Sequence, residues 1–361
     1  MPVKPRHASR LVVTVLAIAL LAWSYLWFRA AMRIPVLSRP AARAEAAVRP
    51  RNQEGPRDPG SACFDPTRRV DVPCPPSNPP VEAAQAGDVK LVESQLARRA
   101  GRKTLDEALF TAARSEPMVN DPSGKAVHEI DLQYARIARL LLKKGASLEA
   151  RDRDGSTPLI LAAGNGETAV VKLFLDKGAD IEATDDYGQT PLIRAACDCP
   201  SIDMPDTDGS VRLLLTRGAN IEARDREGST ALMAAAAWGR TWILQILLDN
   251  GAQIEARNSD GNTALIISAA GGGYPTAEAV QLLLARGAVI EARNDNGNTP
   301  LMLAASQGGS EDVEIVRMLL NKRANVRARN KQGHTALDLA LSKRRTQIIP
   351  LLRVALAASS N

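Results

Sequence analysis

Polar turn residues and apolar stretches alternate along most of the chain in a repeating pattern. The phrase GANIEARDREGSTAL at 218–232 returns with few changes at 178–192, 251–265 and 287–301. Two apolar stretches follow each phrase, and their i, i+3, i+4 spacing predicts two helices with one buried face each. The turn glycine recurs at spacings of 33, 40, 33, 36 and 36 residues, at Gly155, Gly188, Gly228, Gly261, Gly297 and Gly333. The chain therefore repeats a unit of turn, helix, loop and helix.

The residues of the phrase explain why the chain turns and then enters a helix. In DREG at 225–228, an Asx-type residue leads a tight turn and glycine takes the position that needs a positive φ. The second helix is expected to end at a glycine such as Gly178. Arg323 stands at that position near the C-terminus, so this junction is expected to be looser. Each first helix is expected to begin at a capping threonine: Thr157, Thr190, Thr230, Thr263, Thr299 or Thr335.

One such unit has too little core to be stable alone and must stack on its neighbours. By its T-P-L or T-A-L, A-A and L-L-x-x-G-A motifs at this period, the region 81–356 resembles the ankyrin repeat family. The resemblance implies an all-α solenoid of about eight helix-turn-helix units with hairpin fingertips. It further implies that the fingertips and the concave face bind a protein partner.

The first and last units differ from the inner ones. Residues 81–96 form a degenerate first unit, and the stretches 105–114 and 132–143 form a second one. The last unit, 331–356, carries Lys-Arg-Arg at 343–345, as a solvent-facing terminal repeat requires. Insertions at 115–129, 198–210, 271–275 and 308–311 all fall between a first and a second helix. They are expected to crowd one edge of the solenoid, a second candidate contact face.

An uncharged run of eighteen residues near the N-terminus, LVVTVLAIALLAWSYLWF, begins at Leu11 and ends at Phe28. As a helix it spans about 27 Å, close to a bilayer core of about 30 Å. We expect a basic tail over 1–10, a transmembrane signal-anchor over 11–28, a Pro/Arg-rich disordered linker over 29–80 and a short tail over 357–361. A cleaved signal peptide fits less well, because the run is long and no small-x-small site follows closely.

Charge and cysteines bear on the compartment. Residues 1–60 hold ten basic and three acidic residues, a charge of +7, whereas the whole chain has a net charge of +6. The remaining residues, which include the repeats, therefore have no net positive charge that would attract nucleic acid. A signal-anchor usually leaves the C-terminal part exoplasmic, which is the periplasm in a bacterium; the basic flanks do not exclude the cytoplasmic side. Cys63 and Cys74 bracket a Pro-rich segment that a disulfide could close in an oxidising compartment, although the four cysteines allow three pairings.

No arrangement typical of an enzyme is present in the sequence. The three histidines are scattered, no metal-ligand spacing links them to the cysteines, and the acidic residues follow the repeat. We therefore predict a non-catalytic protein without a cofactor, metal or small-molecule substrate. The alternative is a redox or metal-handling accessory protein that uses the pair Cys197 and Cys199.

The interaction surface is predicted from the repeat positions. Aromatic residues suit interfaces, and Trp238 and Trp242 either form an exposed contact or pack under the 198–210 insertion. A glutamate row at 149, 182, 222, 255 and 291 runs beside an arginine row, so the two could pair as a Glu–Arg lattice. Carried over from the family, the candidate partner-binding residues are the fingertip residues Arg153, Asp154, Asp186, Tyr187, Arg226, Glu227 and Asp260. The arginine row just before them adds the candidates Arg151, Arg224, Arg257 and Arg293.

Overall fold

The computed structural model of the 361-residue chain describes residues 62–65, 70–73, 79–96, 100–114, 125–197, 208–271, 275–307 and 311–359. Contacts divide the chain into two compact units, Met1–Pro73 and Cys74–Asn361. Within these described ranges, no helix is long and apolar enough to cross a membrane. The tail 1–10, the apolar run 11–28 and most of the linker 29–80 lie outside them, so the transmembrane helix stays a prediction.

The described part of the N-terminal unit is a short antiparallel hairpin. Strand β1 (Ala62–Asp65) pairs with β2 (Val70–Pro73), with Cys63 opposite Val72. The prediction of a linker without secondary structure over 29–80 missed these strands. Val70 and Val72 are β-branched residues at alternate positions, which favours a strand, but four residues are too few to show a period.

The C-terminal unit contains eight helix pairs in its described residues. The first helices are α2 (Pro79–Gln85), α4 (Arg102–Ala112), α6 (Pro158–Gly164), α8 (Pro191–Cys197), α10 (Ala231–Ala237), α12 (Ala264–Ala270), α14 (Pro300–Ser306) and α16 (Ala336–Ser342). The second helices are α3 (Val89–Leu96), α5 (Lys125–Lys143), α7 (Thr168–Asp176), α9 (Asp208–Thr216), α11 (Thr241–Asp249), α13 (Ala277–Ala285), α15 (Asp312–Asn321) and α17 (Ile348–Ala358). The predicted number of units is confirmed.

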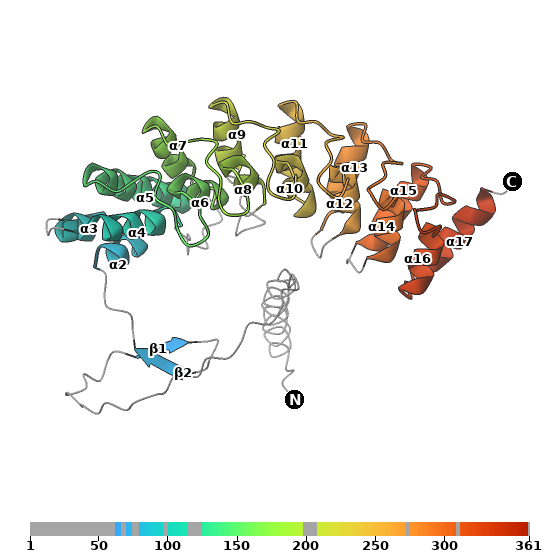
Figure 1. Cartoon of the computed structure of the whole chain (residues 1–361), viewed down its shortest axis with the longest axis horizontal. Helices are drawn as coiled ribbons and strands as arrows, with labels where there is room; N and C mark the ends of the chain where they lie inside the picture. The colour runs from blue at the N-terminus through green and yellow to red at the C-terminus, as the bar shows by residue number, and fades with distance from the viewer. Residues whose placement is uncertain are drawn as a thin grey trace, which may run out of the picture. The chain divides into compact units, whose positions relative to one another are not determined.

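The pairs stack into two layers. Each first helix packs against its own second helix and against the first helices of the neighbouring units, and the second helices contact one another in the same order. Figure 1 shows the resulting curved row, with α2 near one end and α17 at the other. The C-terminal unit is thus the predicted all-α solenoid.

Threonines begin most of the first helices, as expected. The hydroxyl oxygens of Thr157, Thr190, Thr263 and Thr299 each accept the backbone N–H three residues further on, at 3.3 to 3.4 Å. Thr335 does the same within a capping box. Thr230 has the same extended backbone before α10 but caps nothing, and its buried hydroxyl has no hydrogen-bond partner among the described residues. Five described helices therefore share one start signal, and α10 relies on packing instead.

Small residues line the contacts between first helices, and larger ones fill the layer between first and second helices. Buried alanine pairs recur at the ends of first helices, for example Ala195 with Ala196 and Ala235 with Ala236. Second helices contribute the bulkier side chains, and Phe174 of α7 is completely buried. The alanines let successive units approach closely, so each unit covers the apolar face of the next.

Two boundaries of the N-terminal pairs differ from the prediction. Helix α4 occupies Arg102–Ala112 where 105–114 was predicted, and α5 begins at Lys125, earlier than the predicted 132. An apolar stripe is needed to recognise a helix in the sequence, and the residues of α5 before 132, KAVHEID, do not show one. The four insertions do begin in the α4–α5, α8–α9, α12–α13 and α14–α15 connections, and their residues 125–129 and 208–210 form the starts of α5 and α9.

The expected looseness at Arg323 is wrong. Arg323 adopts a φ of 64°, in the same left-handed region as Gly178 with 86°. The N–H of Ala324 then donates to the carbonyl of Leu319 at 3.0 Å, as the N–H of Ala179 donates to Phe174. Because these hydrogen bonds are kept, the arginine replaces the glycine without opening the junction.

Candidate interaction surface

Each finger of the solenoid is a tight turn held by its leading Asx side chain. In the finger at 225–229, Oδ1 of Asp225 accepts the N–H groups of Glu227 at 2.9 Å and Ser229 at 2.8 Å. The N–H of Asp225 also donates to the carbonyl of Ser229 at 3.0 Å. The same two side-chain bonds occur at Asp152, Asp185, Asn258, Asn294 and Asn330. The turn shape is therefore set by the finger itself.

Successive fingers are also joined to one another by backbone hydrogen bonds. The N–H of Asp186 donates to the carbonyl of Asp154, and the N–H of Arg226 donates to Tyr187, both at 2.9 Å. The series continues to the last finger through Ser259 to Glu227, Asp295 to Asp260 and Lys331 to Asn296, at 2.9 to 3.0 Å. The six fingers thus form one continuous, regularly spaced row.

The predicted fingertip side chains lie together along this row and face solvent. Tyr187 is the most exposed aromatic among them, with 60% of its surface accessible. Exposed charges of both signs surround it in the chain and on the next finger. The exposed predicted tip residues are Arg153, Asp154, Asp186, Tyr187, Arg226, Glu227 and Asp260. The row therefore offers a mixed polar surface with one aromatic side chain near its N-terminal end.

The arginine row holds the fingers together. Nη1 of Arg151 donates to the carbonyl of Gly155 in its own finger at 2.7 Å and to Thr184 of the next finger at 2.6 Å. Arg224 and Arg293 bridge their own and the next finger in the same way. Nη1 of Arg257 donates to the next finger at 2.8 Å, and its Nη2 contacts the next finger's Asp295 carboxylate. Each of these arginines is exposed, yet part of its guanidinium is already occupied by backbone.

The glutamate row makes a different set of bonds from the predicted Glu–Arg lattice. Oε1 of Glu222 accepts the N–H of Gln253 in the next unit at 2.7 Å. Equivalent bonds run from the next unit to Glu149, Glu182, Glu255 and Glu291 at 2.7 to 3.1 Å. No glutamate–arginine ion pair joins the two rows in the part of the chain that the structure describes. Both rows instead bind main chain, which the sequence alone could not reveal because the partners are backbone atoms of another unit.

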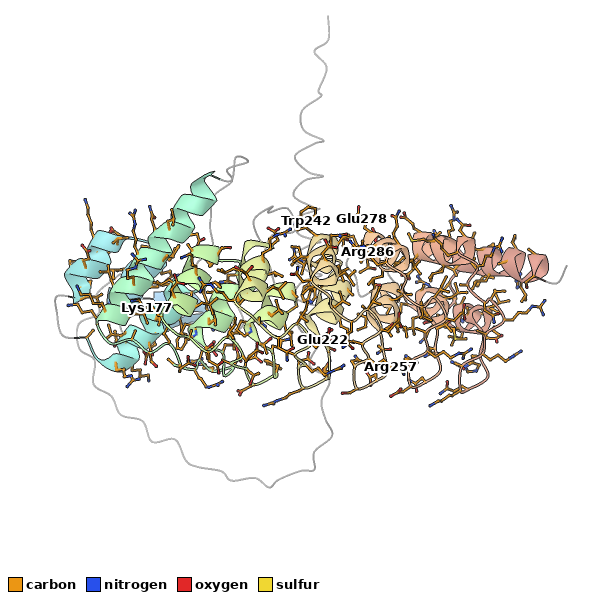
Figure 2. The ribbon with its side chains drawn as sticks, turned by 90° about the horizontal axis from the view of Figure 1, so that it is seen from above. Lys177, Glu222, Trp242, Arg257, Glu278 and Arg286 are labelled. Atoms are coloured by element: carbon orange, nitrogen blue, oxygen red, sulfur yellow. The ribbon has the colours of Figure 1, made fainter. Side chains whose placement is uncertain are left out.

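Trp242 lies on the edge opposite the fingers (Figure 2). Figure 2 shows Trp242 at the far edge of the unit from Arg257, which lies in the finger row. Trp242 is 63% exposed, and its indole N–H donates to Asp208 at the start of α9, at 2.9 Å. Trp238, for which an exposed and a packed position were both open, is half-buried. Since most of the 198–210 insertion lies outside the described residues, the structure places Trp242 beside its final residues and no more.

Trp242 belongs to a small charged cluster. Nε of Arg212 donates to the same Asp208 oxygen at 2.8 Å. Burial raises the pKa of Asp208, but the hydrogen bonds from Arg212 and Trp242 and the charge of Arg212 outweigh it, leaving the pKa below its usual value. Asp208 is therefore a carboxylate at neutral pH, and it fixes the orientation of the exposed indole.

The proposed thiol chemistry has little support at Cys197. This cysteine is buried at the end of α8, and its S–H donates to the carbonyl of Arg194 at 3.4 Å. Reactive cysteines are usually accessible and lie near positive groups that stabilise the thiolate. Cys74, Cys199 and the side chain of Cys63 lie outside the described residues, so every disulfide pairing stays a prediction. Within the described ranges, no three His, Cys, Asp or Glu residues gather as a metal site.

Comparison with known proteins accounts for this architecture. The family described as ankyrin repeats (3 copies) matches residues 126–204, 205–294 and 266–359, well over half of the chain. The chain belongs to the ankyrin-repeat family. Proteins built from ankyrin repeats generally act as non-catalytic protein-interaction modules. The match begins at 126, so the pair α2–α3 and helix α4 precede it, although they stack in the same way. The comparison with curated proteins found no match.

Proposed function

We propose that this ankyrin-repeat protein is a membrane-tethered scaffold that binds a protein partner through its row of fingers. The observation that carries the proposal is the unbroken set of hydrogen bonds from finger to finger. A surface that is already ordered loses little conformational freedom on binding, so more of its contact energy appears as affinity. The exposed tip side chains would make the contacts, and the rows behind them would keep the tips in place.

Tyr187 is the residue expected to contribute most to binding. Tyrosine supplies a large, rigid contact area at low entropic cost, and residues of this kind dominate binding energy at interfaces. Arg151, Arg224, Arg257 and Arg293 contribute indirectly, because each already donates to finger backbone. Arg226 has no ion pair among the described residues and adjoins Tyr187 through its N–H, so the two would act together.

The membrane tether is the second part of the proposal. It is supported by the uncharged run from Leu11 to Phe28, its basic flanks and the Pro-rich composition of 29–80. About fifty flexible residues would give the repeats a root-mean-square reach of roughly 40 Å from the bilayer. The orientation of a signal-anchor would place the repeats on the exoplasmic side, which is the periplasm in a bacterium.

The test places a photo-crosslinking residue at three exposed positions of the full chain in its native membranes. Position 187 probes the fingers, position 242 probes the opposite edge, and position 177, at the end of α7, is the control. A discrete crosslinked protein from position 187, lost when Arg226→Glu is added, is the expected result. Crosslinking from position 242 alone would mean that the partner binds at the opposite edge and not at the finger row. Extraction of the whole chain from membranes by alkaline carbonate would refute the tether independently.

A further inference from the structure

Charge is distributed unevenly along the solenoid, although its total is close to neutral. Residues 145–320 hold fourteen Lys or Arg and twenty-five Asp or Glu, so the middle is acidic. Residues 321–361 hold nine Lys or Arg and a single acidic residue, Asp338. The C-terminal end is therefore strongly basic beside an acidic middle.

The positive charge of this end is largely unneutralised. The carboxylate of Asp338 is occupied by the N–H and the hydroxyl of Thr335, both at 2.8 Å. Arg345 pairs with the buried Asp312 of the preceding unit at 2.5 Å. Lys343, Arg344 and Arg353 are exposed and make no ion pair with a residue that the structure describes. Three cations at or near the last helix pair thus remain available.

Two arginines of this end occupy positions that other units give to glycine. Arg323 and Arg344 have φ values of 64° and 54°, and no other described residue except glycine has a positive φ. The N–H of Arg344 donates to the carbonyl three residues before it, as the N–H of Gly166 and the N–H of Gly239 do. A left-handed backbone is unfavourable for a residue with a side chain, so the charge is present despite a cost to folding.

The outer face of the last helix is apolar where a terminal repeat should be polar. Helix α17 reads IIPLLRVALAA, with Arg353 as its only charged residue. Its exposed residues are Pro350, Arg353, Val354, Ala357 and Ala358, and the first four follow an i, i+3, i+4, i+7 stripe. Val354 is 70% exposed, and Leu341 at the end of α16 is 44% exposed. Terminal repeats of solenoids normally carry a polar outer face, so this face is suited to a partner.

The charge decides which partner fits. A second copy of this end would bring two strongly basic surfaces together, and the N-terminal residues 79–144, with eleven basic and nine acidic residues, are not complementary either. The acidic middle of a second copy would match the charge, but its finger row is a mixed polar surface that does not suit the exposed apolar side chains. Nucleic acid would bind the cations, but it would not bury the exposed apolar side chains of Leu341 and Val354. Anionic phospholipids match both parts, because their headgroups attract Lys and Arg while apolar side chains enter the interface.

We propose that the last helix pair, α16–α17 with its connecting turn, docks on an anionic lipid bilayer. Lys343, Arg344 and Arg353 contact the headgroup phosphates, and Leu341 and Val354 enter the headgroup–acyl boundary. Docking here leaves the finger row of the preceding units accessible. It does not depend on the proposed tether, since the contact needs only the surface of the last unit.

Hydrogen exchange of the full chain, reconstituted in vesicles, tests the docking. Amides of α16 and α17 should exchange about tenfold more slowly in phosphatidylcholine vesicles containing phosphatidylglycerol than in pure phosphatidylcholine, and high salt should remove the difference. The variant Lys343→Glu, Arg344→Gly, Arg353→Glu should lose the protection. Its glycine suits the positive φ, so the fold should be kept, which thermal unfolding checks.

A matched control carries the same change of charge elsewhere. Arg136→Glu and Arg139→Gln on α5 with Lys177→Glu alter exposed residues far along the stack and should keep the protection. Equal exchange in neutral and anionic vesicles would overturn the docking, as would protection by an oligonucleotide without protection by lipid. Flotation with neutral vesicles after a carbonate wash reports the tether alone, so either proposal can fail without the other.

Discussion

The glutamate row allows a quantitative test of how the units are coupled. Glu222→Ala removes the acceptor of the Gln253 N–H, a 2.7 Å bond between consecutive units. Hydrogen bonds to charged groups contribute about 1.5–3 kcal/mol, and partial exposure of Glu222 lowers this to roughly 1–2 kcal/mol of unfolding free energy. Glu222→Gln keeps an oxygen acceptor and loses only the charge, so it should cost about half as much.

Urea unfolding followed by circular dichroism measures these losses, and amide exchange at Gln253 locates them. A double-mutant cycle with Arg224→Gln separates the observed contacts from the Glu–Arg lattice. Because each side chain binds main chain, the two substitutions should be additive to within about 0.5 kcal/mol. A larger coupling energy, or unchanged exchange at Gln253 in Glu222→Ala, would refute the assignment.

Three further predictions concern stability, measured by urea unfolding of single variants. Gly251→Ala should lower the free energy of unfolding by about 1 kcal/mol, because alanine is strained at a φ of 87° but meets no neighbouring atom. Gly239→Ala should lower it by at least about 3 kcal/mol, because the new Cβ would lie 2.0 Å from a carbonyl oxygen of the next unit. Thr299→Ala should cost about 1 kcal/mol by removing a helix cap, while Thr230→Ala, which breaks no such bond, should cost clearly less. Hydrogen bonds from the backbone and hydroxyl of Thr335 lower the pKa of Asp338 in the folded protein. The carboxylate therefore stabilises the fold fully above the ordinary carboxyl pKa of about 4, and this contribution disappears as the pH falls through the lowered folded pKa. The difference between wild type and Asp338→Asn should therefore shrink in an acid titration.

Local chemistry could be predicted from the sequence, and contacts between units could not. The finger turn and the cap at Thr157 depend on residues within a few positions of each other, so the identities of those residues are enough to predict them. Glu222 binds a main-chain N–H 31 residues away, and any residue at that position would offer the same group. No side-chain pattern therefore marks the partner, and the parallel Glu and Arg rows suggested a pairing that the stacking does not make.

The distribution of charge, the exposure of the tryptophans and the two short strands also could not be predicted from the sequence. A nearly neutral repeat domain hid a basic end beside an acidic middle, because a sum over the domain discards position. Trp238 and Trp242 are four residues apart on neighbouring elements, and the order of their exposure depends on how α10 meets α11. The strands at 62–65 and 70–73 were missed because each is shorter than the window in which alternation becomes visible.

Because hydrogen bonds join adjacent fingers, the distance between fingers in space does not depend on how many residues separate them along the chain. Turn glycines follow one another after 33, 40, 33, 36 and 36 residues, yet the bond linking adjacent fingers stays at 2.9 to 3.0 Å throughout. All the extra residues enter between first and second helices, away from those bonds. The molecule can therefore lengthen its opposite margin and acquire new surface there without altering the pitch of the fingers.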